Sequence, residues 1–144
     1  MPAIGESLKQ FWLRYNIKLR RGASKAELRE FEGKYKVRLP DDLKDYFATV
    51  DGSGLDENVI EFLPLAEVVP LSQAWSRKPE ANSYFVFADY SLSCHVYAIR
   101  LTDDLPLGNP VFIVYDENPQ QIAGSFSEFV RGYLADDYGI LFPQ

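Results

Sequence analysis

The spacing of apolar residues changes part-way along this 144-residue chain, and that change limits the folds open to it. Up to residue 50, apolar side chains recur every three or four positions, as on one face of a helix. From residue 59 onward they alternate or form short runs, as in strands, until helical spacing returns near the C-terminus. We therefore expect helices at both ends of the chain and a sheet between them.

Local signals predict where the first two helices begin and end. Residues 3–15 carry apolar side chains at helical spacing and predict the first helix. A connector with a basic cluster follows at residues 16–22. Ser24, with Glu27 three positions later, has the capping-box spacing and is expected to open the second helix. Pro40 stops that helix, because a residue before proline is pushed out of the helical conformation.

Two further helices are predicted from the same kinds of signal. Pro40 is expected as the first residue of the third helix, and Asp51-Gly52-Ser53-Gly54 is expected to end it. Ser125 and Glu128 repeat the capping-box spacing and open the last helix. The tail after it, residues 135–144, contains the run Ile140-Leu141-Phe142, which we expect to dock on the domain.

The middle of the chain predicts a meander of strands joined by short turns. Consecutive strands with short connections favour antiparallel pairing. Helices at the ends then favour an α+β fold, with an antiparallel or mixed sheet of about four to six strands covered mainly on one side. The expected strands are Val59–Leu65, Tyr84–Ala88, His95–Leu101 and Pro110–Tyr115.

Composition indicates one globular domain over residues 1–144 and excludes several classes. A single cysteine, Cys94, and a single histidine, His95, exclude an intrachain disulfide and the usual four-ligand zinc sites. A net charge of −6 argues against a nucleic-acid binder, which normally has a basic surface. No apolar run is long enough to span a membrane and no signal peptide is evident, so we expect a cytoplasmic protein.

Catalytic motifs are absent from the sequence. His95 and Cys94 are neighbours on an expected strand, so their side chains point to opposite faces and cannot form a catalytic pair. The sequence holds no nucleophile elbow, dinucleotide fingerprint or phosphate-binding loop. We therefore expect a structural or solvated His95, no catalytic residue, no metal and no cofactor.

Charge is distributed unevenly along the chain. Residues 1–50 carry a balance of +4, residues 51–100 a balance of −4 and residues 101–144 a balance of −6. One interpretation is a set of solvated helix faces and acidic turns. The other is an acidic pole that attracts a basic partner.

Seven segments follow one another in the order of a known family pattern: Ser24–Glu27, Leu39–Phe47 with Asp51-Gly52, Ile60–Val68, Phe85–Asp89, Val96–Ile99, Pro110–Phe112 and Ser125–Phe129. Together they make the chain resemble the SUKH superfamily. Its founding member is a fungal cell-wall synthesis regulator, and many bacterial members are immunity proteins of toxin systems. Asp51-Gly52 stands where the family usually has Asn-Gly, and Tyr90-Ser91-Leu92-Ser93-Cys94 replaces a glycine-rich stretch of many members. The resemblance covers residues 24–134 and leaves residues 1–23 as an N-terminal helix and connector.

The resemblance implies a non-enzymatic binding protein. In bacterial members the partner is typically a toxin domain, often a nuclease or a deaminase, and an acidic chain can cover a basic cleft in such a domain. We expect no direct binding of nucleic acid or membrane, and a monomer or weak homodimer. Turn position and charge select the candidate contact residues, which are Asp56, Glu57, Asp89, Tyr90, Asp103, Asp104, Asp116 and Glu117.

Two alternatives remain open from the sequence. The first is an intracellular scaffold or regulator of the cell-wall regulator type. The second is a small hydrolase acting through a carboxylate pair, which requires a deep pocket with two converging carboxylates of perturbed pKa.

Overall fold

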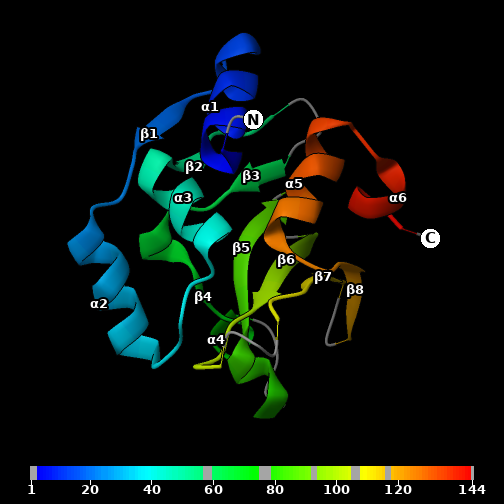
Figure 1. Cartoon of the computed structure of the whole chain (residues 1–144). Helices are drawn as coiled ribbons and strands as arrows, with labels where there is room; N and C mark the ends of the chain where they lie inside the picture. The colour runs from blue at the N-terminus through cyan, green and yellow to red at the C-terminus, as the bar shows by residue number, and fades with distance from the viewer. Residues whose placement is uncertain are drawn as a thin grey trace.

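The computed structural model describes residues 3–56, 60–74, 79–91, 94–104, 108–115 and 118–143. Glu57, Asp116 and Glu117, three of the candidate contact residues, lie outside the described residues. The described part is an α+β fold, as the sequence predicts, with helices packed on a mostly antiparallel sheet (Figure 1).

The main sheet has six strands, which run antiparallel to their neighbours. Five of them lie in the order β3, β5, β6, β7, β8, and β4 pairs with β5 on the same edge as β3. A separate two-stranded sheet joins β1 and β2. The strands are β1 (Leu19–Arg21), β2 (Val50–Ser53), β3 (Ile60–Phe62), β4 (Val69–Pro70), β5 (Tyr84–Tyr90), β6 (His95–Arg100), β7 (Val111–Val114) and β8 (Pro119–Ala123).

Helices begin and end the described chain. The α-helices are α1 (Ile4–Arg14), α2 (Lys25–Tyr35), α3 (Asp41–Thr49), α4 (Leu71–Ala74), α5 (Phe126–Leu134) and α6 (Tyr138–Leu141). Two 3₁₀ turns are η1 (Leu65–Glu67) and η2 (Pro79–Ser83).

The predicted capping signals are confirmed in detail at α2 and in part elsewhere. The Ser24 side chain accepts from the Glu27 N–H, and the Glu27 carboxylate accepts from the Ser24 N–H. Ser125 caps α5 in the same way, but the Glu128 carboxylate instead accepts from the N–H of Gly124. Pro40 is the N-cap of α3 rather than its first residue, so the helix begins one position later than predicted, and the Pro40 carbonyl accepts from the Lys44 N–H.

The predicted helix cap at Asp51-Gly52-Ser53-Gly54 is wrong. Helix α3 passes directly into β2 at Val50, whose φ of −150° and ψ of 126° are those of a strand. The connector before α2 contains the partner strand β1, so that Leu19 lies opposite Ser53. Pairing between segments so far apart in sequence leaves no local signal, and residues 51–53 become a strand although they contain glycine.

Strand β8 was also not predicted. It is an edge strand in the described sheet, and its residues Gln120 and Gln121 are exposed. An edge strand with exposed side chains needs no apolar alternation, which explains why the sequence carries no strand pattern there.

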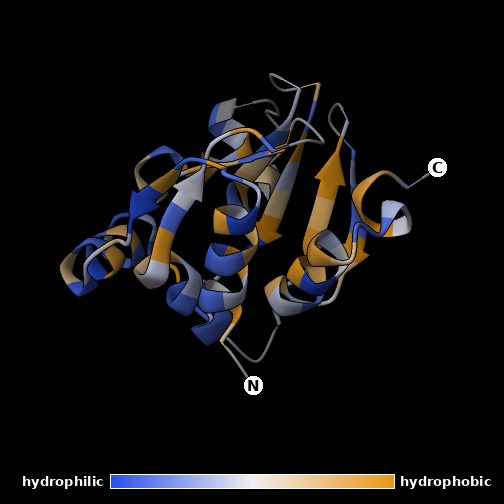
Figure 2. Cartoon of the chain, turned by 90° about the horizontal axis from the view of Figure 1, so that it is seen from above, coloured by the Kyte–Doolittle hydropathy of each residue, from blue (hydrophilic) through white to orange (hydrophobic). Residues whose placement is uncertain are grey.

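The hydrophobic core lies mainly between the sheet and the helices α1, α3 and α5, and the central strands are the most uniformly hydrophobic part of the chain (Figure 2). A smaller cluster on the opposite face of the sheet includes Leu71 and Ala81, from α4 and η2. A register shift between Val86 and Ala88 turns both Phe87 and Ala88 toward the main core. Strict alternation along β5 predicts that Ala88 shares a face with Val86, and that prediction is wrong, because Ala88 lies in the main core and Val86 in the smaller cluster.

Helix α1 belongs to the same core as the sheet. Trp12 is 0% exposed, and its ring lies edge-on to Phe62 of β3 at a centroid distance of 5.1 Å. Its Nε1–H donates to the hydroxyl of Tyr133 in α5 at 2.9 Å. The N-terminal helix is thus held by contacts to the sheet and to the closing helix.

Candidate functional site

The candidate contact residues do not share one surface. Antiparallel pairing places Tyr90 of β5 beside His95 and also beside Ile60, which bonds to Asp56. Asp56, Asp89 and Tyr90 therefore lie at one end of the sheet. Asp103 and Asp104 are exposed and follow the other end of β6, where Arg100 pairs with the first residue of β5.

Asp56 is anchored by two hydrogen bonds. Its Oδ1 accepts from the N–H of Ile60 at 2.9 Å, and its Oδ2 accepts from the hydroxyl of Tyr133 at 2.6 Å. The Tyr133 oxygen also accepts from Trp12, so a hydrogen-bonded chain runs from the core to the half-buried carboxylate. Burial raises the pKa of Tyr133, and the negative charge of Asp56 raises it further, so Tyr133 stays protonated and keeps donating.

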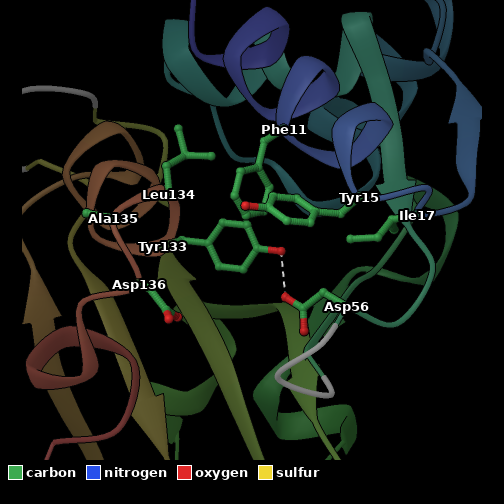
Figure 3. Close-up of a pocket in the computed structure, with 8 residues that line it drawn as sticks. All are labelled: Phe11, Tyr15, Ile17, Asp56, Tyr133, Leu134, Ala135 and Asp136. Atoms are coloured by element: carbon green, nitrogen blue, oxygen red, sulfur yellow. Dashed lines mark hydrogen bonds between the residues drawn. The ribbon is translucent and has the colours of Figure 1, made fainter.

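A hollow of about 180 Å³ surrounds this carboxylate (Figure 3). Helix α1 contributes Phe11, and Tyr15 is the residue directly after this helix; the rings of both lie over the ring of Tyr133 from α5. Asp56 lies where the Tyr133 hydroxyl points, and Asp136 follows the end of α5. The hollow thus combines aromatic rings with two carboxylates, and Ile17, Leu134 and Ala135 complete its lining.

A second group of carboxylates, which we call the acidic strip, consists of Asp51, Glu61, Glu67 and Asp89. Asp89 of β5 lies directly opposite Glu61 of β3 in the antiparallel register. Burial raises the pKa of the Asp89 carboxyl, and the negative charges of Glu61 and Glu67 raise it further. Burial likewise raises the pKa of Asp51, which accepts from the N–H of Leu65 at 2.6 Å. Like charges placed opposite each other on a sheet destabilise it.

His95 is a buried structural residue, in agreement with the prediction. It is 4% exposed, and its ring stacks on Tyr90 at 4.7 Å with an interplanar angle of 11°. Its Nε2 lies 3.1 Å from the hydroxyl of Tyr97, which donates to the carbonyl of Leu141 at 2.7 Å. Because that hydroxyl proton is used, Nε2 carries a proton and donates, while the ring stays neutral. Tyr90 follows the apolar strand segment in a polar stretch of sequence, which predicts an exposed ring, but the ring is half-buried because it covers His95.

Acid is expected to weaken the fold through His95. Burial lowers the pKa of His95 to about 4, below the ordinary value of 6.5 that it regains on unfolding. Stability from the neutral ring is therefore fully present above about pH 6.5 and is lost as the pH falls toward about 4, on the order of 2–3 kcal/mol. Urea unfolding of wild type and His95→Gln from pH 7 to pH 4 measures this difference. Glutamine keeps an N–H for Tyr97.

Comparing wild type with His95→Gln separates the effect of His95 on the pH dependence of stability from the effect of the carboxylates. Asp51 and Asp89 have raised pKa values, so their protonation shifts stability in the opposite direction as the pH falls. That contribution is common to wild type and variant and cancels in their difference. Parallel stability curves for the two proteins would contradict the assignment to His95.

Sequence comparison identifies the family of the chain. The family profile described as SMI1 / KNR4 family (SUKH-1) matches residues 22–132, which is most of the chain. The chain belongs to the SMI1/KNR4 family. Membership places it among immunity or regulatory domains, which act through binding to other proteins. A search of curated proteins finds no matching relative.

The matched residues leave out both ends of the SMI1/KNR4 chain. Phe11 and Tyr15, before the matched range, and Tyr133 and Asp136, after it, all line the hollow. The acidic strip, in contrast, lies entirely within the matched range. The hollow is therefore built largely from the parts of this chain that the family profile does not describe.

The candidate contact residues chosen from the sequence leave out several residues of the hollow and of the acidic strip. Glu61 lies between the apolar residues Ile60 and Phe62 in an expected strand. Strand alternation therefore predicts that its side chain points away from the core. Tyr15 and Tyr133 fit helical apolar faces and gave no further signal. Only the packing of α1 beside α5 brings them to Asp56.

Three further observations concern the described residues. They include no group of three His, Cys, Asp or Glu side chains positioned to hold a metal ion. Within the same residues, no helix has both the length and the apolar character needed to cross a membrane. Cys94 is exposed and His95 is buried, so the two do not form a pair that acts on one substrate.

Proposed function

We propose that this protein is an immunity protein that binds a bacterial toxin domain of nuclease or deaminase type in the cytoplasm and covers its active site. It acts as a monomer or weak homodimer and carries out no chemistry itself. Family membership supports a binding role of immunity or regulatory type. The net charge of −6 favours a basic partner.

The observation that carries the proposal is the acidic strip. Asp89 and Glu61 are opposite each other in adjacent strands, and the raised pKa of Asp89 indicates that the fold works against its ionisation. A basic surface docked on the strip would favour the ionised form and remove the repulsion. Carboxylates held together at a cost to stability are typical of surfaces selected for binding.

Electrostatic complementarity explains how such a protein would act quickly. Opposite charges on the two surfaces steer their encounter and raise the association rate, and salt screens this attraction. A nuclease must hold the phosphate backbone of nucleic acid with lysine and arginine side chains. An acidic protein that covers those side chains competes with the nucleic acid, so no catalytic group is needed.

The first experiment isolates the partner. Tagged protein is used to capture partners from the source cells at low and high salt, and mass spectrometry identifies them. We expect one stoichiometric protein with a basic domain, lost at high salt, whose expression arrests growth unless this protein is co-expressed. Capture of several housekeeping proteins and no toxin would contradict the immunity role and support the scaffold alternative. Capture of no partner would also contradict it and would direct a substrate screen at the carboxylates.

The second experiment tests the acidic strip with matched variants. We expect Glu61→Gln with Asp89→Asn to weaken binding of the captured toxin domain about 10-fold or more and to reduce its salt dependence. The control is Asp103→Asn with Asp104→Asn, which removes the same charge from the opposite end of the sheet. Titration calorimetry at two salt concentrations measures both. Equal affinities for the two double variants would contradict binding through the strip.

A further inference from the structure

We propose that the hollow between α1 and α5 is a socket for one arginine side chain of the partner. The inference rests on the proposed function, because it is the basic partner that supplies the arginine. The socket adds one specific contact to those that the acidic strip makes with the partner. It is formed by Phe11, Tyr15, Asp56, Tyr133 and Asp136. These residues come from the two ends of the chain and the turn before β3.

The size of the hollow suits a side chain. Its volume of about 180 Å³ is below the roughly 300–1,000 Å³ of sites for small-molecule ligands. It is open to solvent, because Tyr15 is 47% exposed and Asp136 is also exposed. A side chain projecting from a docked protein can therefore enter it without any rearrangement of α1 or α5.

The aromatic rings favour a cation with a flat face. The ring centroids of Phe11 and Tyr15 are 5.0 Å apart, and those of Phe11 and Tyr133 are 5.5 Å apart. Rings gathered in this way present π faces and edges around one space (Figure 3). A guanidinium group stacks on aromatic rings and is weakly hydrated, so it leaves water more readily than the ammonium group of lysine.

Charge selects a cation over a neutral planar group. Asp56 accepts from the Tyr133 hydroxyl and from the Ile60 N–H, and its carboxylate lines the hollow. Asp136 places a second carboxylate on the lining. Because Asp56 is already held in position, little conformational freedom is lost when it pairs with a guanidinium group.

The hydrogen-bonded chain supplies a direct readout. Trp12 is fully buried and does not line the hollow, yet its indole N–H donates to the oxygen of Tyr133, which donates to Asp56. A cation at Asp56 polarises this chain and changes the resonance of the Trp12 indole N–H. The chain contains two tryptophans, so the indole signals are few and assignable by substitution of Trp75.

The test is an NMR titration of the full chain with N-acetyl-arginine amide. We expect a saturable shift of the Trp12 indole signal with weak, millimolar affinity. N-acetyl-citrulline amide, which has nearly the same shape without charge, should bind at least 10-fold more weakly, and N-acetyl-lysine amide about 3-fold more weakly. No saturable shift, or equal affinity for arginine and citrulline, would overturn the proposal.

Variants assign the binding to the hollow. We expect Asp56→Asn, which keeps the acceptor for Tyr133 but removes the charge, to weaken arginine binding at least 5-fold. Tyr15→Leu should weaken it about 3-fold or more. Tyr138→Leu is the matched control, because Tyr138 is 56% exposed and does not line the hollow. Equal effects of Tyr15→Leu and Tyr138→Leu would overturn the assignment.

The captured partner separates this inference from the proposed function. If Tyr15→Leu weakens toxin binding about 10-fold while Tyr138→Leu does not, the socket is used in the complex. If the toxin binds wild type and Tyr15→Leu equally, the socket is wrong while the immunity role stands. If no toxin partner is captured but arginine still binds with the predicted selectivity, the immunity role is wrong, and the site still recognises arginine on another protein.

Discussion

Replacing Trp12 with alanine is expected to lower the free energy of unfolding by about 3–5 kcal/mol. The indole is 0% exposed and contacts the rings of Tyr46, Phe62 and Tyr133, from two helices and the sheet. Its removal leaves a cavity at the junction of these elements. The Tyr133 hydroxyl keeps Asp56 as its acceptor, so the loss comes mainly from packing. Chemical denaturation at pH 7 measures the change.

The Trp12 variant also tests whether the chain is one domain. Trp12 lies outside the residues matched by the family profile, and we propose that residues 1–144 nevertheless form a single cooperative unit. Leu13→Ala is the matched control on the same helix, because Leu13 is 49% exposed and should change stability by less than about 0.5 kcal/mol. Equal small effects of the two substitutions would contradict the integration of α1 into the core.

Replacing Gly52 with alanine is expected to destabilise the fold by roughly 2–6 kcal/mol, the sum of backbone strain and overpacking. Gly52 has a φ of +87°, in the left-handed region that a side chain disfavours. A Cβ atom there would lie 2.6 Å from the Phe62 carbonyl oxygen and 2.8 Å from the nitrogen of Pro64. Both are backbone atoms, so β3 itself would have to move. Thermal and urea unfolding give the magnitude.

A second glycine separates the two causes. Gly108 has a φ of +80°, but a Cβ atom there would meet nothing within 4 Å. Gly108→Ala therefore isolates the conformational effect, which we expect at about 1 kcal/mol. The excess loss in Gly52→Ala measures the close approach of β2 to β3. Because β3 carries Glu61, we also expect Gly52→Ala to weaken binding of the proposed toxin partner more than Gly108→Ala does. Similar losses of stability in Gly52→Ala and Gly108→Ala would contradict the predicted clash between a Cβ atom at position 52 and the backbone of residues 62–64.

Elements predicted well from the sequence depend on interactions within a few residues. The capping box of Ser24 and Glu27 is closed by hydrogen bonds across three positions, so the residue types alone reveal it. Phe85 and Phe87 share one face of β5, the core face, as the strand period of two predicts for residues two positions apart. These signals suffice for the α+β class and for the order of helices and strands.

Errors arose where a distant segment decides the local structure. Residues 51–53 carry the composition of a helix cap and form a strand because β1 lies beside them. Ala88 faces the core because β5 and β6 shift register at Phe87. In both places the free energy gained from strand pairing outweighs the local preference, which is a weak guide for strands.

The sequence by itself determined the fold class, the family resemblance and the acidic character of this protein, because period, capping and charge are properties of short segments. Only the tertiary structure decided which acidic residues share a surface. Strand order placed Asp89 opposite Glu61 and moved Asp103 to the other end of the sheet. Helix packing brought Tyr133 to Asp56, 77 positions away in the sequence. Such neighbours depend on register and packing across the whole domain, which no local pattern encodes.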